Sequence, residues 1–385
     1  MIEPDRILGG PPLVSVASNG HGPGNVVEEL HGWLAELVAR DGSDLHIKVG
    51  SPPKIRDTGS LVALKREPLT PEETRTISDA IVPQGRTERF ETAGEVDFAY
   101  SIPKLGRFRV NVFRQRGVVS VVFRKLRFGG PTFEEMGLPD PIRRLVEEPR
   151  GLVLVTGPTG SGKTTTLAAM IEHLNRLRPW HIVTIEDPIE VLFRDAVASI
   201  DQREVGDDTQ DFLSALRAAL RQDPDVILIG EMRDTETVRA ALQAAETGHL
   251  VLSTLHTVNA TETVNRVVDF FPPHQQGQIR QTLAGALRGI VCQRLLPAQG
   301  GGLLPCHEIL VNTGRIAERI SDADRTVEIH DVIAEGGYYG MLTFDQSLLG
   351  LVQTGKISIA AALACTSNPH DLTLQFQQHD IALPT

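Results

Sequence analysis

Cysteine is scarce in this chain of 385 residues, which contains only Cys292, Cys306 and Cys365. These residues are scattered along the sequence, and no C-x-x-C pair occurs. The sequence therefore offers no zinc site, and its cysteine usage fits a reducing cytoplasm. A chain of this length is expected to form two domains rather than one, with ample residues for a sizeable core.

Long apolar runs and an excess of basic residues are absent as well. No run reaches the roughly 18 apolar residues that a membrane-spanning helix requires. The amino-terminus carries acidic residues rather than the basic and apolar stretch of a secretory signal. We therefore expect no transmembrane segment and a soluble protein that stays inside the cell. The net charge of −11 and the isoelectric point near 5.6 argue against bulk affinity for nucleic acid, although a local basic face stays compatible with them.

The most informative stretch is a glycine-rich loop between an apolar run and a helical pattern. Residues 152–155 predict a buried parallel strand, and apolar residues at helical spacing from Leu167 to Leu174 predict a helix. Between them, GPTGSGKT has the P-loop pattern, in which backbone N–H groups and a lysine surround phosphate oxygens. The strand–loop–helix context disfavours the alternative, an ordinary surface turn. The residues expected to bind a nucleoside triphosphate are Gly157, Pro158, Thr159, Gly160, Ser161, Gly162, Lys163, Thr164 and Thr165, with the Thr164 hydroxyl also available to Mg²⁺.

The remaining patterns predict two folded domains of α+β and α/β type. Residues 1–25 are rich in Gly, Pro, Ser and Asn, and we expect them to form a disordered tail. Residues 26–127 mix helical and strand-like patterns and predict a small α+β domain, in which the tetrapeptide TPEE at Thr70 is typical of a capped helix start. Residues 128–134 are interpreted as a linker to the domain that carries the P-loop, residues 135–385.

A basic segment, residues 104–127, contains eight basic side chains and no acidic one. The alternation in RFRVNVFR places Arg107 and Arg109 on one face of a strand and apolar side chains on the other. Two interpretations stay open. The arginines belong to a solvated strand face, or Arg107, Arg109 and Arg114 are offered to a phosphate that another domain or subunit binds.

Acidic residues follow the two strands expected next beyond the P-loop helix. Residues 181–185 predict a strand that runs into the cluster EDPIE, which ends at Glu190. Acids just past a strand of such a sheet suit the binding of water or a metal, with a solvated acidic turn as the alternative. Residues 225–229 predict a buried strand that leads to Glu231. This is the Walker B arrangement, so we expect Glu231 to hold Mg²⁺ directly or through water.

A histidine lies at each end of the following strand, residues 249–257. His256 lies at the carboxyl end, where ligands bind in nucleotide-binding sheets, and we expect it to sense phosphate. For His249 a structural role stays as open as a functional one. Farther on, the pattern of residues 273–291 predicts an amphipathic helix, and residues 303–370 predict a helical tail without recognisable chemistry.

Over residues 43–372 the chain resembles the retraction ATPases of type IV pili, the PilT-type branch of the secretion ATPase superfamily. The motifs that carry the resemblance are SDLH at 43–46, GPTGSGKT at 157–164, TIEDPIE at 184–190, ALRQDPDVILIGEMRD at 219–234 and TGHLVLSTLHT at 247–257. The resemblance implies a PAS-like amino-terminal domain joined to a RecA-like P-loop ATPase domain. It also implies assembly as a homo-hexameric ring that hydrolyses ATP with Mg²⁺.

The resemblance assigns roles to single residues. It makes Glu190 the catalytic carboxylate, places Glu231 at the metal, and puts His249 and His256 in a histidine motif, with His249 among the nucleotide-contacting residues. The arginines of the RFRVN segment would reach the nucleotide of a neighbouring subunit. The residues expected to neutralise developing phosphate charge are Arg107, Arg109 and Arg114.

The resemblance implies a cytoplasmic motor, peripheral at the inner face of the cytoplasmic membrane, that couples ATP hydrolysis to pilus retraction and twitching motility. The absent zinc module and the short amino-terminal region favour retraction over the alternatives within the superfamily, pilus assembly and type II secretion. The alternatives of another class are an ATP-gated scaffold without motor activity and a nucleic-acid translocase, and the acidic balance argues against the translocase.

The partners implied by the resemblance are further copies of the chain, an inner-membrane pilus platform protein and a second pilus ATPase, without nucleic acid. The chain departs from the family pattern in one place. Retraction ATPases usually carry an AIRNLIRE-like stretch where residues 315–322 read RIAERISD. The shifted charges predict a changed coupling to the pilus machinery rather than a changed nucleotide site.

Overall fold

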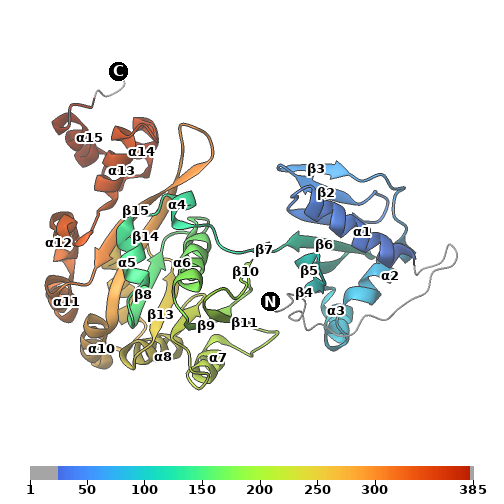
Figure 1. Cartoon of the computed structure of the whole chain (residues 1–385), viewed down its shortest axis with the longest axis horizontal. Helices are drawn as coiled ribbons and strands as arrows, with labels where there is room; N and C mark the ends of the chain where they lie inside the picture. Colours follow the sequence, from blue (N-terminus) through green and yellow to red (C-terminus); the bar gives the residue numbers. More distant parts are fainter. Residues whose placement is uncertain (1–24, 382–385) are drawn as a thin grey trace. The chain divides into compact units, whose positions relative to one another are not determined.

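The structure, a computed structural model, describes residues 25–381 (Figure 1). The chain divides into two compact units between Arg127 and Phe128. The tail predicted for residues 1–25 lies outside the described residues except for Asn25, where the first helix begins. No helix in the described part of the chain combines the length and the apolar character needed to cross a membrane.

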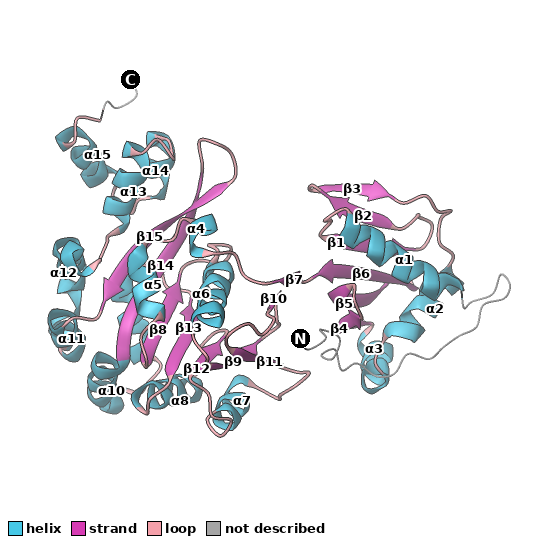
Figure 2. Ribbon diagram, in the orientation of Figure 1, coloured by secondary structure: helices cyan, strands magenta, loops and turns pink. Residues whose placement is uncertain are grey.

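The first unit is a six-stranded antiparallel sheet with helices packed against it (Figure 2). The strand order is β3-β2-β1-β6-β5-β4. Its elements are α1 (Asn25–Ala39), β1 (Asp44–Lys48), β2 (Lys54–Asp57), β3 (Ser60–Ala63), α2 (Pro71–Ile81), the 3-10 turn η1 (Gln84–Arg86), α3 (Thr87–Ala93), β4 (Glu95–Ile102), β5 (Gly106–Gln115) and β6 (Val118–Lys125). The core of this unit joins apolar residues of α1 and α2 to one face of the sheet.

Sequence patterns account for two features of this unit. The predicted capping box begins α2: Glu73 N–H donates to Thr70 Oγ1 at 3.2 Å, and Thr70 N–H donates to Glu73 Oε2 at 2.8 Å. In β5, Phe108 and Val110 are fully buried while Arg109, between them, is exposed, as period-two alternation predicts.

The second unit is built on a seven-stranded sheet in the order β11-β9-β12-β13-β8-β14-β15. The first six strands are parallel, and β15 runs antiparallel to β14. The elements from residue 127 onward are β7 (Arg127–Phe128), α4 (Phe133–Met136), α5 (Asp140–Val146), β8 (Gly151–Thr156), α6 (Lys163–Leu177), β9 (His181–Glu186), β10 (Val191–Leu192), β11 (Ser199–Glu204), α7 (Phe212–Ala219), β12 (Val226–Ile229), α8 (Thr235–Glu246), β13 (Leu250–Leu255), α9 (Ala260–Asp269), α10 (Pro273–Ala286), β14 (Leu287–Pro297), β15 (Leu303–Val311), α11 (Gly314–Ser321), η2 (Ala323–Glu328), α12 (Ile329–Glu335), η3 (Gly336–Tyr339), α13 (Phe344–Gln353), α14 (Ile359–Cys365) and α15 (Pro369–Gln378).

Side chains of β8 alternate between two cores, one on each face of the sheet. Leu152 and Leu154 pack with apolar residues of α7 to α10 and of the carboxyl-terminal helices. Val153 and Val155 pack with residues of α4, α5 and α6. The second unit is therefore a three-layer α/β arrangement in which the P-loop strand is central and buried on both faces, as its continuous apolar run predicts.

Part of the segment interpreted as a linker, residues 128–134, is built into the second unit. Thr132 caps α4, and Phe133 is buried among residues of α5 and α6. Gly130 lies so close to α6 that a Cβ atom there would be 2.3 Å from the Ala168 carbonyl oxygen. The compact second unit accordingly begins at Phe128.

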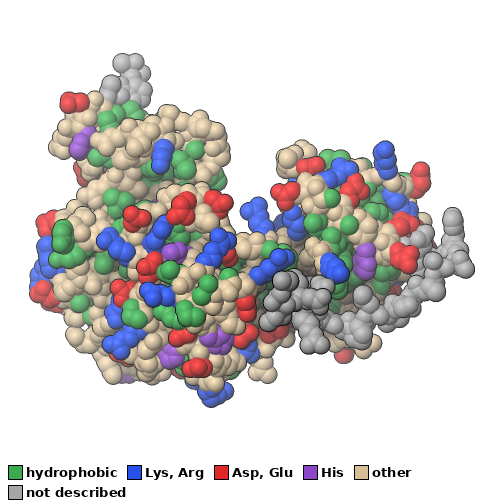
Figure 3. All heavy atoms as spheres, viewed as in Figure 1, with side chains coloured by type: hydrophobic (Ala, Val, Ile, Leu, Met, Phe, Trp, Pro, Cys, Tyr) green, Lys and Arg blue, Asp and Glu red, His purple; other side chains and the backbone are tan. Residues whose placement is uncertain are grey.

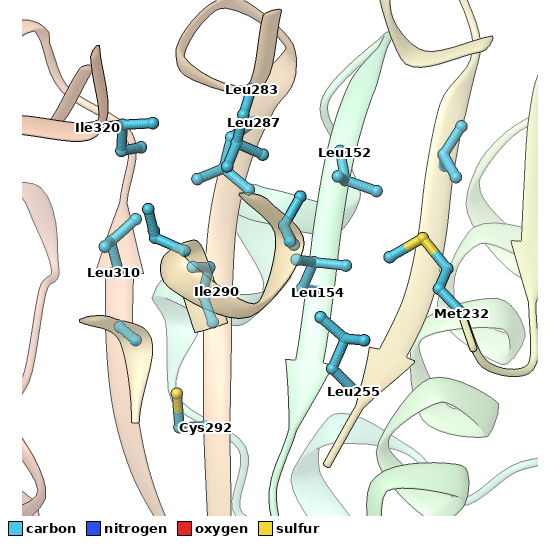
Figure 4. Packing of buried hydrophobic residues seen from close by; sticks show 14 of the residues in the cluster. Leu152, Leu154, Met232, Leu255, Leu283, Leu287, Ile290, Cys292, Leu310 and Ile320 are labelled. Carbon is cyan, nitrogen blue, oxygen red and sulfur yellow. The ribbon is translucent and has the colours of Figure 1, made fainter. Parts of the chain in front are cut away.

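Two predictions for the carboxyl-terminal part are wrong. The helix predicted over residues 273–291 ends at Ala286, and Leu287 and Ile290 lie on strand β14, opposite Leu152 and Leu154 of β8 respectively (Figure 4). Residues 303–311, predicted to be helical, form β15. A short apolar run does not distinguish a buried strand from a buried helix. Here pairing decides the outcome, since β14 pairs with β8 and β15 pairs with β14.

Candidate functional site

The loop between β8 and α6 has the backbone conformation that its glycines predict. The φ angles of Gly157, Gly160 and Gly162 are 146°, 80° and 88°, a region that side chains other than glycine rarely adopt. Helix α6 begins at Lys163, directly after the loop, so the free N–H groups of its first turn adjoin the loop. Loop and helix terminus together form a positively polarised nest of the kind that binds anions.

Lys163 holds its ammonium group at this loop. Its Nζ atom donates to the carbonyl oxygens of Gly157 at 2.8 Å and Pro158 at 3.0 Å. Burial lowers the pKa of Lys163, and the carboxylate of Glu231 acts in the opposite direction. A cation held in this way presents a point charge to a phosphate bound in the loop.

The loop opens onto a cleft of about 580 Å³. The predicted residues that line it are Thr159, Gly160, Gly162, Lys163, Thr164, Thr165, Glu190, Glu231 and His256. Gly157, Pro158 and Ser161 belong to the loop without lining this cleft. The fold thus brings the P-loop together with the acidic residues that follow β9 and β12 and with the histidine that follows β13.

Glu231 and His256 are positioned by hydrogen bonds between the ends of their strands. Thr254 Oγ1 donates to the Gly230 carbonyl oxygen at 2.7 Å, which joins the end of β13 to the residue before Glu231. His256 Nε2 lies 3.6 Å from Glu231 Oε2, and Arg233 forms an ion pair with the other carboxylate oxygen. This carboxylate therefore lies between two basic side chains at the cleft.

Glu186 is a cleft residue that the sequence analysis did not single out. It is the last residue of β9, and its carboxylate accepts hydrogen bonds from Thr184 Oγ1 at 2.6 Å and Gln202 Nε2 at 3.3 Å. Burial raises the pKa of Glu186 above its ordinary value, although these hydrogen bonds oppose the rise. The position of Glu186 at the end of a strand beside the Walker B strand could have indicated a functional role. The sequence analysis assigned the catalytic carboxylate of this motif to Glu190 instead.

The structure does not bring His249 to the cleft. His249 precedes β13 at its amino end, seven residues and therefore roughly 20 Å from His256 at the carboxyl end. Its Nδ1 lies 3.0 Å from the Ala244 carbonyl oxygen at the end of α8. The expectation that His249 contacts the nucleotide is not met within this chain, and its observed contacts are structural.

The predicted arginines all lie on β5 in the first unit, and the residues that line the cleft all belong to the second unit. Arg114 forms an ion pair with Glu91 and lies over the Phe90 ring at 5.3 Å. Arg109 is exposed, and its Nε is 3.9 Å from Asp97 Oδ1. Arg107 has a buried Nε atom without a hydrogen-bond partner.

The donors in the cleft suit a metal that binds together with phosphate. Among the described residues, no group of three or more His, Cys, Asp or Glu side chains could hold a metal by itself. Mg²⁺ usually takes only one or two protein oxygens and completes its shell with water and phosphate. The Thr164 hydroxyl and the Glu231 carboxylate are oxygen donors of this kind, and both line the cleft.

A P-loop at the carboxyl edge of a buried parallel sheet, faced by acids from two further strands, defines a RecA-like P-loop ATPase. The family model described as "Type II/IV secretion system protein" matches residues 66–334, and the chain belongs to this family. The predicted fold class and the resemblance to secretion ATPases are therefore confirmed.

Relatives and solved structures similar to this chain are named for pilus retraction or twitching motility. The type IV pilus retraction ATPase PilT of Pseudomonas aeruginosa is 45% identical over 325 residues, which cover 84% of this chain and 94% of that protein. A twitching motility protein of Neisseria gonorrhoeae is 41% identical over 322 residues, 83% of this chain and 86% of that protein. The crystal structure of the pilus retraction motor PilT with bound ADP matches with a TM-score of 0.81 and 43% identity, over 90% of this chain and 98% of that one.

Proposed function

We propose that this protein is an ATP-driven motor that retracts type IV pili and so powers twitching motility. The observation that carries the proposal is the cleft in which the P-loop, Glu190, Glu231 and His256 converge. The similarity to the retraction ATPase PilT, along 94% of that protein, supports the particular use of the ATPase. The working form is a homo-hexameric ring, cytoplasmic and peripheral at the inner face of the cytoplasmic membrane.

Nucleotide binding follows from the loop and the first turn of α6. Backbone N–H groups of the loop and of the first turn of α6 surround the phosphates, although Pro158 has no N–H and the Ser161 N–H donates to the Pro158 carbonyl oxygen. Lys163 supplies the charge next to the terminal phosphates. Mg²⁺, which would be held by Thr164 and Glu231, would neutralise phosphate charge and orient the terminal phosphate. The Ser161 side chain is buried and its N–H donates to the Pro158 carbonyl oxygen at 3.2 Å, so we assign Ser161 the role of shaping the loop around the phosphates.

Hydrolysis requires an oriented water molecule and a place for its proton. Glu190 is exposed at the cleft, and we assign it the role of general base or water-positioning carboxylate. We assign His256, whose Nε2 lies 3.6 Å from Glu231 Oε2, the role of responding to the terminal phosphate. Phosphoryl transfer depends mainly on positioning and electrostatics. These groups therefore form a complete catalytic site once a further positively charged side chain is supplied from outside the cleft.

That charge is proposed to come from the first unit of a neighbouring copy, through Arg107, Arg109 and Arg114. An arginine supplied in trans makes turnover depend on assembly of the ring. An inner-membrane pilus platform protein receives the motion, and a second pilus ATPase is a further candidate partner. The alternatives are pilus assembly or type II secretion driven by the same ATPase, or ATP-gated scaffolding without turnover.

The test combines purified protein with a host strain that lacks it. The strain should assemble pili but lose twitching, and the wild-type protein should restore twitching. Glu190→Gln should bind ATP normally yet lower turnover by about 10²–10⁴-fold, because the general base is lost, and should not restore twitching. A strain that loses its pili would identify an assembly motor, and a complete wild-type ring that binds ATP without turnover would identify a scaffold.

A further inference from the structure

A fully buried glutamine lies directly behind the P-loop, and none of the roles described above involves it. Gln293 is on β14, which pairs with β8 in a register that places Cys292 opposite Thr156. Thr156 is the last residue before the loop, so Gln293 is level with Gly157, where the loop begins. A Cβ atom on Gly157 would be 2.3 Å from the Gln293 carbonyl oxygen, which shows how closely the two segments approach.

The side-chain amide of Gln293 joins the loop to the helix that follows it. Its Nε2 donates to the Ser161 carbonyl oxygen at 2.7 Å, and its Oε1 accepts from the Thr166 hydroxyl at 2.7 Å. Ser161 lies in the loop, and Thr166 lies in the first turn of α6. One amide therefore fixes the loop against the helix on both sides of Lys163.

His307 on β15 completes the cluster behind Gln293. The His307 side chain is buried, and its Nε2 lies 3.3 Å from Gln293 Oε1. Burial lowers the pKa of His307 to about 4, so near pH 7 the imidazole is neutral and carries one N–H donor. An N–H directed at Oε1 favours the amide orientation in which Nε2 faces Ser161.

The hydrogen bond to Ser161 controls the direction of a P-loop N–H group. In a planar trans peptide unit, the carbonyl oxygen and the next N–H point in opposite directions. A Ser161 carbonyl held toward Gln293 therefore turns the Gly162 N–H away from Gln293, and Gly162 lines the cleft. Gly162 itself has a φ of 88°, and a Cβ atom there would be 2.8 Å from Gln293 Nε2.

We propose that Gln293 is a positioning residue for nucleotide binding, which holds the Ser161–Gly162 peptide and the first turn of α6 in the conformation that receives phosphate. The inference rests on the proposed function of the P-loop. Gln293 does not line the cleft, so it acts through the loop and not on the reacting atoms. Its removal leaves a carbonyl oxygen and a hydroxyl buried without their partner, and the loop relaxes to satisfy them.

The test is Gln293→Met in the full-length protein, because methionine keeps the length of the side chain but forms neither hydrogen bond. With ATP and Mg²⁺ as the probe, Kd should rise about tenfold or more, because two buried polar groups lose their partner and the loss of one alone costs about that factor. The kcat at saturating ATP should fall much less, because the groups that act on the bound nucleotide are unchanged.

Asn175→Leu is the matched control for loss of a buried amide. Asn175 is on the same helix, roughly 18 Å from Lys163, and is also buried. Its Nδ2 donates to the Arg194 carbonyl oxygen at 2.8 Å, and its Oδ1 accepts from Ala196 N–H at 3.0 Å. This variant should lower Tm and leave the Kd for ATP unchanged. If Gln293→Met behaves in the same way, the positioning role is wrong.

Thr166→Val is an independent test of the positioning role of Gln293, because it removes the hydroxyl that donates to Gln293 and keeps the shape of the side chain. If Gln293→Met does not fold, a weaker affinity of Thr166→Val for ATP supports the proposal, and an unchanged Kd contradicts it. Wild-type protein that binds no ATP at all would contradict the proposed function itself. Normal wild-type binding together with an unchanged Kd in both variants contradicts only the role of Gln293.

Discussion

His307 links the burial of a single side chain to the pH dependence of stability. Its pKa is lowered from 6.5 to about 4, so between these values the unfolded chain binds a proton that the folded chain does not. This contribution to stability is complete above pH 6.5 and is lost as the pH falls toward 4. The shift corresponds to about 3 kcal/mol over that range.

The prediction is tested with His307→Gln, which removes the titrating group and keeps a side-chain donor. Urea unfolding at pH 7, 6, 5 and 4 should show wild-type stability falling relative to the variant as the pH decreases. The same substitution at the exposed His370 controls for the loss of an imidazole in general. A stability difference between wild type and His307→Gln that stays constant with pH would contradict the assignment.

Single residues of the site differ in how far the sequence predicts them. Lys163 and Thr164 are read directly from a contiguous motif, and Glu231 from a strand that ends in a carboxylate. Gln293 leaves no such signal, because its role depends on a strand more than 120 residues beyond the loop, and the two hydrogen bonds span sequence separations of 127 and 132. His249 is the opposite case: a motif groups it with the nucleotide-contacting residues, whereas it precedes the amino end of β13 and does not line the cleft.

At the level of elements, β14 shows where pattern analysis fails. Its apolar residues continue the spacing of α10, so the sequence predicts one long helix. Gly289 marks the change: it pairs with Val153 of β8, just after a register shift. A Cβ atom there would be 2.7 Å from the Leu310 carbonyl oxygen and 2.5 Å from Leu145 Cδ1. This close packing against β15 and α5 is long-range information that local periodicity does not contain.

We therefore expect two glycine-to-alanine substitutions to have opposite effects on the free energy of unfolding. Gly289→Ala forces a methyl group against backbone and should lower the free energy of unfolding by about 1–3 kcal/mol. Gly277 is exposed on α10, and a Cβ atom there would have no atom within 4 Å apart from its chain neighbours and the backbone of its own helix. Gly277→Ala should therefore raise the free energy of unfolding by up to about 1 kcal/mol through better helix propensity. Chemical denaturation measures both. If Gly277→Ala destabilises as much as Gly289→Ala, the close-packing explanation is wrong.

At the scale of the whole molecule, the fold class is predictable from the sequence because each of the two units has its own core. The apolar clusters of the first unit and of the P-loop unit draw on separate segments of the chain. Acidic and basic side chains are interspersed over each unit on the face shown in Figure 3. The proposed supply of an arginine by a neighbouring copy depends on assembly, and neither strand alternation nor a motif specifies which copy supplies it.

Among the three arginines of β5, Arg109 is the best candidate for action in another subunit. Its side chain is exposed, whereas Arg114 is already held by Glu91 and Phe90, and Arg107 is partly buried. If Arg109 serves the P-loop of a neighbouring copy, the defects of Arg109→Ala and Lys163→Ala lie on opposite sides of a shared site. Each variant alone should then form inactive rings.

Mixing these two variants in equal amounts should restore ATP hydrolysis. A shared site is intact when an Arg109→Ala copy supplies the P-loop and a Lys163→Ala copy supplies the arginine, which random assembly gives at about one half times one half, or one interface in four. Differently tagged copies verify that mixed rings form, and phosphate release measures turnover. The matched control mixes Lys163→Ala with Glu190→Gln, whose defects lie in the same cleft, so no intact site arises and activity stays absent. If mixed rings of the first pair stay as inactive as the control, Arg109 does not act in a neighbouring subunit and belongs to a solvated strand face.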